Sequence, residues 1–360
     1  MKSIIVTEFV KDLSSLRVTT HPSPTPPLAV NCVTIAIKSA ALNYVDILYS
    51  RGQHQNNTSL VKPPFTLGLE FSGVVISSPP FCPWPPGTAV FGESLGSFST
   101  HLVLPSGPEL FSSLHVVPPG WTWGQAASIP ATMTVAYGAL VLRGQLAEGE
   151  TVLVHGAAGG LGVMAVQIAL AMGARRVYCT ARGARKCDVV KGLEGVREEY
   201  KGRVKVFDTS REGKWWETIL QETGGKGVDV VFDGVGMVDQ SLKCLAHRGR
   251  VLVVGFAGRD AGSMEGVKMN RVLLKQAVLI GYRYGESSRR YPGEKEQIWN
   301  ELWPLIEEGR IRPVVYDEVY KGLESVPRAL KDLEERKVWG KAVVTVDDDQ
   351  DMPKVKAARL

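Results

Sequence analysis

The stretch that decides the fold is Thr151-Val152-Leu153-Val154-His155-Gly156-Ala157-Ala158-Gly159-Gly160-Leu161-Gly162, where a short apolar run passes directly into a glycine cluster. Ala157, Gly159 and Gly162 have the spacing of the G-x-G-x-x-G fingerprint, with alanine in the first position. Such a turn lets backbone N–H groups approach a pyrophosphate at the amino end of a helix, where a Cβ atom would collide with it. The stretch therefore predicts a buried strand, a phosphate-binding turn and a helix.

Strands and helices alternate around this turn, from Ala126 to about Tyr284. Short apolar runs typical of buried strands recur at Val177–Thr180, Val204–Phe207, Val228–Phe232, Arg250–Val254 and Ala277–Ile280. Helix-compatible segments separate them. This alternation predicts a parallel sheet with helices on both faces, a doubly wound Rossmann domain over residues 126–284.

A different pattern occupies residues 1–125. Clusters of Pro, Gly and Ser separate short β-rich runs at Val33–Lys38, Gly73–Ser77, Ala89–Gly92 and Phe98–Leu104, which predicts a small β-barrel or sandwich. Residues 285–346 hold two predicted helices and two strands, too few to bury a core of their own. We therefore expect them to complete the N-terminal domain, with residues 347–360 as a flexible tail.

The composition is that of a globular protein with about two domains. The chain has 360 residues, of which 44% are hydrophobic and 22% charged. The net charge of +5 is spread thinly, without the basic stripe that nucleic-acid binding would favour. No apolar run approaches the ~18 residues of a membrane span. The five cysteines are scattered without C-x-x-C spacing, which predicts neither a disulfide framework nor a zinc lobe and favours a soluble protein of a reducing compartment.

The end of the second strand indicates which dinucleotide is bound. An NAD site places Asp or Glu there, to bond the ribose 2′-OH. Here the strand runs into Ala181-Arg182-Gly183-Ala184-Arg185-Lys186, with three cations and no carboxylate. This favours a 2′-phosphate and hence NADPH. The alternative is a solvated charge run, since Arg175 and Arg176 are also near.

Several ordered motifs resemble one known family over about Ile4 to Val346. The motifs are Ala40-Ala41-Leu42-Asn43-Tyr44-Val45-Asp46, Leu67-Gly68-Leu69-Glu70-Phe71-Ser72-Gly73, Ala126-Ala127-Ser128-Ile129-Pro130, the glycine turn, Val228–Gly236 and Gly249–Gly255. They resemble the zinc-free branch of the medium-chain dehydrogenases/reductases, the quinone oxidoreductase or ζ-crystallin-like proteins. The resemblance implies an α/β fold: a GroES-like β-barrel domain interrupted by a Rossmann doubly wound parallel-sheet domain, with the active site between them.

The resemblance also bears on metal. Zinc-containing relatives have Cys at the Asn43 position and Gly-His-Glu where Gly68-Leu69-Glu70 stands here. Asn and Leu are not zinc ligands, and Glu70 alone cannot make a site, so we expect no metal. Reduction of a simple carbonyl develops a localised alkoxide that a Lewis acid stabilises. Without metal, a conjugated acceptor is favoured, because its charge delocalises into an enolate or hydroquinone anion.

Residues of the cofactor site are carried over from the family by position. Thr134 matches a threonine at the nicotinamide end, and Lys186 and Arg336 match two cations that grip the 2′-phosphate. The tyrosine that often helps them falls near Thr209, so Arg182 or Arg185 is expected to substitute. The remaining predicted cofactor residues are Gly156, Ala157, Ala158, Gly159, Gly160, Leu161 and Gly162 of the turn, with Gly255, Phe256 and Asn270 in later loops.

The predicted catalytic residues are Asn43, Asp46, Tyr49 and His54. The first two match motif positions beside the nicotinamide. His54 is a candidate proton donor near neutral pH, although an exposed loop histidine is the alternative. Tyr49 is a second candidate donor, or else a helix residue that packs on the barrel. Water is a third proton source, and His155 is predicted to be a satisfied core histidine.

The sequence thus predicts an NADPH-dependent reductase of quinones or α,β-unsaturated carbonyls, acting on a small molecule, with no membrane or nucleic-acid partner. The resemblance to the family implies a homodimer. An enoyl-thioester reductase is the enzymatic alternative, and a non-catalytic NADPH-binding protein is the alternative of another class. The last residues, Ala358-Arg359-Leu360, resemble the peroxisomal S-K-L signal. The expected location is therefore cytoplasmic or peroxisomal.

Overall fold

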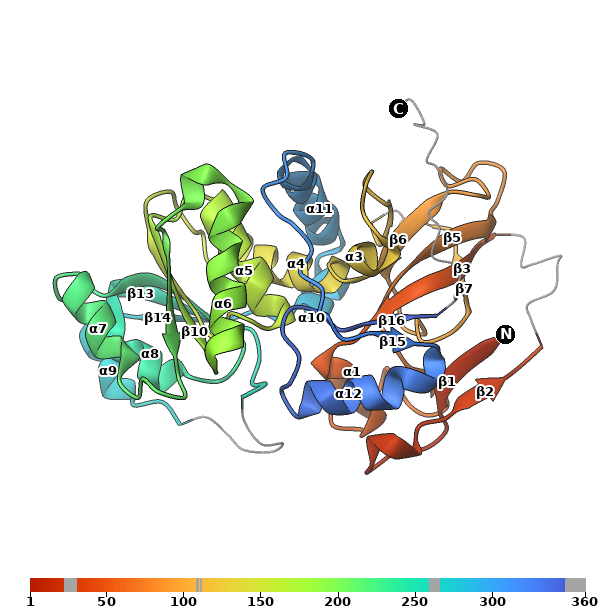
Figure 1. Cartoon of the computed structure of the whole chain (residues 1–360), viewed down its shortest axis with the longest axis horizontal. Helices are drawn as coiled ribbons and strands as arrows, with labels where there is room; N and C mark the ends of the chain where they lie inside the picture. Colours follow the sequence, from red (N-terminus) through yellow and green to blue (C-terminus); the bar gives the residue numbers. More distant parts are fainter. Residues whose placement is uncertain (23–30, 108–109, 111, 259–265, 347–360) are drawn as a thin grey trace. The chain divides into compact units, whose positions relative to one another are not determined.

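The computed structural model describes residues 1–22, 31–107, 110, 112–258 and 266–346. Contacts divide the chain into two units, one of Met1–Ala131 with Pro313–Leu360 and one of Thr132–Arg312 (Figure 1). The predicted tail, with the tripeptide Ala358-Arg359-Leu360, lies outside the described residues. In the described part of the chain, no helix is both long and apolar enough to cross a bilayer.

The division differs from the predicted domain boundaries of 126 and 284. The segment after Tyr284 forms helix α11 (Pro292–Glu307), which belongs to the second unit. The chain beyond it is fixed to a helix of that unit, because the side chain of Gln167 accepts from the Arg312 N–H at 2.9 Å and donates to its carbonyl at 3.1 Å. Only the residues from Pro313 onward belong with the N-terminal part.

The first unit contains two sheets. A three-stranded sheet has the order β2 (Val18–Thr20), β1 (Lys2–Val6), β4 (Phe65–Thr66). A seven-stranded sheet has the order β15 (Tyr320–Lys321), β16 (Val343–Thr345), β3 (Cys32–Ala41), β5 (Glu70–Ser77), β6 (Ala89–Glu93), β8 (Leu114–Val116), with β7 (His101–Pro105) paired to β3. The C-terminal strand β16 runs antiparallel to β3, with Val344 opposite Ala40.

These described strands do not close into a barrel, which corrects the predicted barrel. The small sheet meets the chain before β7 through one isolated bridge, between Ser3 and Ser99, and no continuous ladder joins the two sheets. Two backbone hydrogen bonds, from the Ile4 N–H to the Phe98 carbonyl and from the Thr100 N–H to the Lys2 carbonyl, add to side-chain packing in joining them. The short helices of this unit are η1 (Leu13–Ser15), α1 (Tyr44–Ser50), η2 (Gln55–Thr58), α3 (Trp123–Ala127), η6 (Leu323–Ser325) and α12 (Val326–Glu334).

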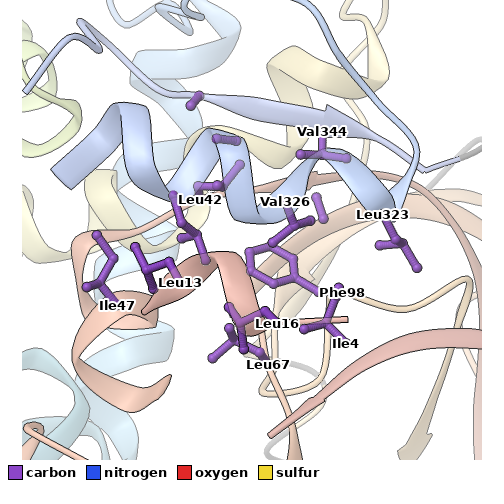
Figure 2. Packing of buried hydrophobic residues seen from close by; sticks show 14 of the residues in the cluster. Ile4, Leu13, Leu16, Leu42, Ile47, Leu67, Phe98, Leu323, Val326 and Val344 are labelled. Atoms are coloured by element: carbon purple, nitrogen blue, oxygen red, sulfur yellow. The ribbon is translucent and has the colours of Figure 1, made fainter. Parts of the chain in front are cut away.

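The core of the first unit combines both ends of the chain, as Figure 2 shows. Helix α12 buries Val326, Ala329 and Leu330, whose i, i+3, i+4 spacing places them on one face. This face packs in one cluster with Ile4 of β1 and Ile47 of α1. The N-terminal sheet therefore depends on the C-terminal helix for its buried surface.

The second unit is a six-stranded parallel sheet. Its order is β11 (Val204–Asp208), β10 (Arg176–Ala181), β9 (Thr151–Val154), β12 (Val228–Asp233), β13 (Leu245–Val253), β14 (Val278–Gly281). Numbered within this unit, the order is 3-2-1-4-5-6, that of a doubly wound dinucleotide-binding fold. The predicted Rossmann domain is confirmed, and strand order reverses between β9 and β12.

Helices cover both faces of this sheet. Side chains alternate along each strand, so Leu153 and Tyr178 pack with α7 (Trp215–Glu222) and α8 (Val238–Cys244) in one cluster. The alternate residues Val152 and Val154 are also fully buried, and they face the other way. The remaining helices are α4 (Pro130–Tyr137), which crosses the boundary between units, η3 (Gly138–Arg143), α5 (Gly160–Ala171), α6 (Ala184–Gly192), η4 (Leu193–Val196), η5 (Glu198–Tyr200), α9 (Met269–Lys275) and α10 (Tyr284–Arg290).

Candidate active site

The glycine turn lies at the reversal point of the second unit, between β9 and α5. Gly156 has a φ of +59°, which favours glycine. A Cβ on Gly162 would lie 2.3 Å from the Gly156 carbonyl oxygen, so Gly162 is required by the turn itself. A Cβ on Gly159 would meet nothing closer than 3.4 Å. Gly159 is also the N-cap of α5, and no side chain caps that helix. The amino end of α5 therefore fits an anionic group.

Two neighbouring loops complete this edge of the sheet. The Asp233 carboxylate, buried at the end of β12, accepts hydrogen bonds from the backbone N–H groups of Val235, Gly236 and Met237. The loop after β13 is tied to it, because the Ala257 N–H donates to the Gly234 carbonyl at 3.1 Å. The predicted cofactor residues Gly255 and Phe256 lie in this second loop, and the Phe256 side chain is exposed. Asp233 is a positioning residue that the sequence analysis did not single out.

The predicted cations follow β10 at the same edge. Arg182 and Arg185 are exposed and Lys186 is half-buried, at the start of α6. The neighbouring carboxylate of Asp208, at the end of β11, accepts from the Gly183 N–H at 2.8 Å. Hydrogen bonds from Ser210 and Gly183 lower the pKa of Asp208 to about 2. Asp208 was not predicted, because the residues that indicate the type of dinucleotide follow the second strand, whereas Asp208 ends the third.

Thr209, near which the family's tyrosine was expected, directly follows β11, and its hydroxyl donates to the Ala181 carbonyl at 3.2 Å. The other three predicted cofactor residues lie elsewhere in the chain. Thr134 is fully buried on α4. Asn270 is exposed on α9. Arg336 follows α12 in the first unit, exposed and with a φ of +57°. Their roles at the cofactor stay predictions.

His155 serves the core. Its two ring nitrogens lie 2.9 Å from the Thr180 hydroxyl and 2.8 Å from the Ser241 hydroxyl, all buried. Burial lowers the pKa of the imidazole, which favours the neutral form. The geometry is that of the satisfied core histidine predicted from the sequence.

The predicted catalytic residue Asn43 lies in a buried charged cluster of the first unit. Its Nδ2 donates to Glu70 Oε2 at 2.7 Å, and its Oδ1 accepts from Lys341 Nζ. Lys341 Nζ also pairs with Glu70 Oε2 at 2.5 Å, with 5% and 0% of the two side chains exposed. The other oxygen of Glu70 accepts from the Ala131 N–H at 2.7 Å, in the first turn of α4. Lys341 was not among the predicted site residues.

Asp46 is the second carboxylate of this cluster. It is fully buried, and its Oδ2 accepts from the Asn43 N–H at 2.7 Å. Its Oδ1 is buried without a hydrogen-bond partner among the described residues. Burial raises the pKa of Asp46 to about 7, with Glu70 adding to the rise and Lys341 opposing it. Burial therefore favours the protonated form of the Asp46 carboxyl.

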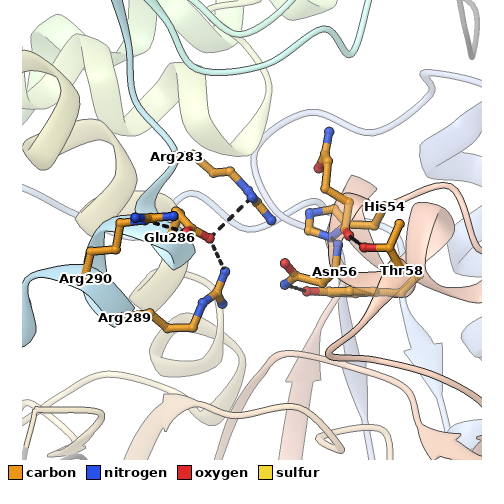
Figure 3. Close-up of polar contacts among 9 residues, drawn as sticks. His54, Asn56, Thr58, Arg283, Glu286, Arg289 and Arg290 are labelled. Carbon is orange, nitrogen blue, oxygen red and sulfur yellow. Dashed lines mark hydrogen bonds and ion pairs between the residues drawn. The ribbon is translucent and has the colours of Figure 1, made fainter.

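Tyr49 and His54 form a separate group beside α1. Their ring centroids are 4.5 Å apart, and Asn56 joins them. The Asn56 side chain donates to the Tyr49 hydroxyl at 2.7 Å, while the Asn56 N–H donates to His54 Nδ1 at 3.1 Å (Figure 3). His54 is half-buried and is the N-cap of η2, so it has a structural function that the sequence analysis did not foresee. The proton-donor roles of both residues stay predictions.

Helix α10 carries a group of charged side chains at Tyr284–Arg290. Glu286 lies at the centre of three arginines there. It contacts Arg289 and Arg290 at 2.7 Å each and Arg283 at 3.4 Å (Figure 3). Hydrogen bonds from Arg289 and Arg290 lower the pKa of Glu286 to about 2, so the group carries a net positive charge. It is a basic surface in the second unit.

The arrangement of acidic and metal-ligating groups does not suit a metal. Among the described residues, no group of three or more His, Cys, Asp or Glu side chains is placed to hold one. In the Asn43 cluster, the Lys341 ammonium already contacts the Asn43 and Glu70 oxygens that a cation would need. A second positive charge there would be repelled.

Two family models match the chain. The alcohol dehydrogenase GroES-like domain matches residues 30–139, and the zinc-binding dehydrogenase domain matches residues 160–307. A polyketide synthase system protein for spectinabilin (NorB, Streptomyces orinoci) is 32% identical over 90% of this chain, which covers 14% of that protein. The chain thus spans a small fraction of the polyketide synthases that it matches.

Relatives of similar length are matched over most of their length. Quinone oxidoreductase-like protein 2 of Bos taurus is 30% identical over 89% of this chain and 86% of that protein. The structure of Escherichia coli quinone oxidoreductase complexed with NADPH has a TM-score of 0.77 and 25% identity, and covers 96% of this chain and all (100%) of that one. The chain therefore belongs to the quinone oxidoreductase type of the medium-chain dehydrogenases/reductases, a family of oxidoreductases.

Proposed function

We propose that this protein is an NADPH-dependent reductase of quinones or α,β-unsaturated carbonyls. The observation that carries the proposal is the uncapped amino end of α5 at the reversal point of the sheet, beside β10, which is followed by Arg182, Arg185 and Lys186. The first feature suits a pyrophosphate and the second suits a 2′-phosphate. The NADPH complex of the E. coli relative supports the same choice.

In this proposal, each predicted site residue has a role in binding the cofactor or in reducing the acceptor. When bound, NADPH supplies a hydride to the conjugated acceptor. The cations at the start of α6 and Arg336 hold the 2′-phosphate, and Thr134, Gly255, Phe256 and Asn270 orient the rest of the cofactor. Asn43 donates a hydrogen bond to the acceptor, and the fully buried Asp46 accepts from the Asn43 N–H and so positions this residue. Tyr49, His54 or water is the proton source.

The experiment is steady-state NADPH oxidation by the purified protein with a panel of quinones and enones, with NADH in parallel. We expect turnover with at least one conjugated acceptor and a preference for NADPH. Tight NADPH binding without oxidation by any acceptor would instead favour the non-catalytic NADPH-binding protein.

An enoyl-thioester reductase is the second candidate, favoured by two observations. The chain resembles parts of polyketide synthases, and the arginines around Glu286 form the basic surface that a CoA-type phosphate needs. Two crotonyl thioesters, one of CoA and one of the short N-acetylcysteamine that lacks the CoA phosphates, are added to the panel to distinguish the two candidate functions. A strong preference for the CoA thioester, lost in Arg289→Ala with Arg290→Ala, would support this candidate over the first.

We further propose catalysis without metal, because Asn43 and Leu69 replace metal ligands and the Lys341 ammonium binds the remaining oxygens. We therefore expect chelators such as EDTA to leave NADPH oxidation unchanged, and elemental analysis to find no stoichiometric zinc. Zinc lost together with activity on chelation would contradict this prediction.

A further inference from the structure

The Asn43 side chain is fixed in one orientation by its two charged neighbours. An ammonium can only donate a hydrogen bond, so Lys341 must face the amide oxygen, whereas the Glu70 carboxylate can only accept and must face the amide nitrogen. A flipped amide would oppose donor to donor and acceptor to acceptor. The network therefore determines where both hydrogens of Nδ2 point.

One of these hydrogens is left for a ligand. Nδ2 carries two, and Glu70 takes one at 2.7 Å; the described residues provide no acceptor for the other. Asn43 is half-buried, in contrast to the buried Lys341 and Glu70 behind it. The remaining N–H is thus a rigid donor at the accessible end of a buried ionic cluster.

The charge of Lys341 strengthens this donor. An ammonium bonded to the carbonyl oxygen of an amide draws electron density toward that oxygen, which leaves the amide N–H more positive. The effect is large where little water is present, and the side chain of Lys341 is only 5% exposed. Lys341 therefore acts on whatever Asn43 binds, without reaching it.

We propose that Lys341 is a positioning residue, which fixes and polarises the Asn43 amide so that its remaining N–H stabilises the negative oxygen of a reduced conjugated carbonyl. The inference rests on the proposed function and deepens it. Hydride adds to the β-carbon of the acceptor, the electron pair of the C=C bond moves toward the carbonyl, and the resulting enolate oxygen accepts the Asn43 hydrogen bond. A proton then adds to the α-carbon, which balances the reaction. Such preorganised donors act on the charge that develops in the transition state.

The test compares Lys341→Met, Asn43→Ala and the double variant in NADPH oxidation with the best enone. Loss of an oxyanion donor lowers kcat by roughly 10²–10³, so we expect about a hundredfold loss for Asn43→Ala and about tenfold for Lys341→Met. The KM and Kd for NADPH should be unchanged in all three. Because the proposed effect of Lys341 on kcat passes through Asn43, the double variant should lose no more kcat than Asn43→Ala alone. Lys321→Met, at an exposed lysine of β15, is the matched control and should retain full activity.

Lys341→Met leaves the Glu70 charge buried and unpaired, so this variant could lose activity by unfolding. A second variant serves as the control for this effect. Glu70→Gln combined with Lys341→Met removes both charges, and circular dichroism verifies that it is folded. That variant should keep the lowered kcat. Two results would overturn the role of Lys341 while leaving the proposed function intact. One is a wild-type kcat in the folded variant that carries both Glu70→Gln and Lys341→Met. The other is a loss of kcat in the Asn43→Ala, Lys341→Met double variant that equals the product of the two single losses. Absence of any wild-type turnover overturns the proposed function together with the role of Lys341.

Discussion

At the scale of single residues, cofactor choice is assigned to the cations after β10. A charge-assisted contact to phosphate contributes about 1.5–3 kcal/mol. We expect Lys186→Ala to weaken NADPH binding roughly ten- to a hundredfold and to leave NADH binding almost unchanged, as measured by fluorescence titration. Lys191→Ala, at an exposed lysine on the same helix α6, is the control. Equal weakening of both cofactors by Lys186→Ala would contradict the assignment.

Asp46 makes stability depend on pH. Its pKa is raised mainly by burial, from an ordinary 3.8 to about 7 in the folded protein. Below about pH 4 the carboxyl is protonated in both the folded and the unfolded protein, and the folded state is then most stable with respect to this group. This stability is lost as the pH rises through 7, because the unfolded state releases the proton more readily than the folded state. Asp46→Asn keeps an oxygen for the Asn43 N–H and cannot ionise. We expect the variant to gain about 2–4 kcal/mol relative to wild type between pH 4.5 and pH 8, measured by urea unfolding. A difference between the two proteins that is constant with pH would refute this.

The Asn43 cluster shows which residues a sequence can and cannot reveal. Asn43 and Asp46 were predicted because they lie in one short motif. Lys341 was not, because 298 residues separate it from Asn43 and a lone lysine before a strand carries no signal of burial. Asp208 was missed for a similar reason: its contact with Gly183 joins the ends of two different strands.

At the scale of elements, the β9–α5 turn separates glycines needed for the fold from one needed for the ligand. A Cβ at Gly162 would lie 2.3 Å from backbone, whereas at Gly159 the nearest atom is 3.4 Å away. We expect Gly159→Val to abolish NADPH binding and retain the wild-type melting temperature, while Gly162→Val destabilises the second unit. Calorimetry with NADPH and thermal unfolding measure the two effects. NADPH binding by folded Gly159→Val at wild-type affinity would show that the turn does not hold the pyrophosphate.

The elements themselves were predicted with uneven success. The inner strands β9, β10 and β12 of the second unit were recognisable, because each is a short apolar run that is buried on both faces, as in Val228–Asp233. Sheet closure in the first unit was not, since it depends on whether β1 and the chain before β7 pair continuously, and they share one bridge between Ser3 and Ser99. The position of α11 depends on contacts such as that of Gln167 with Arg312, which no local pattern encodes.

At the scale of the whole molecule, an apolar surface supports the predicted homodimer. Strand β14 is at the edge of the parallel sheet, and next to it α9 exposes Leu273 and Leu274 by 76% and 74%. Leu274→Glu places a charge on this surface and should convert a dimer to monomers, as seen by sedimentation velocity. The control Leu60→Glu, at an exposed leucine of the first unit, should not. A wild-type protein that sediments as a monomer would contradict the prediction.

The buried cluster of the first unit also has a consequence for synthesis. Lys341, β16 and α12 are made after the entire second unit, yet they supply the partner of Asn43 and much of the core around Ile4. During translation, all residues of the second unit are synthesised before α12 and β16. Until those two elements are made, the apolar side chains of the N-terminal strands stay exposed to solvent. A chain that stops before Pro313 would thus contain the whole glycine turn but lack Lys341, the partner of Asn43. Only a chain that extends through β16 has both the phosphate-binding turn and the buried Asn43 cluster.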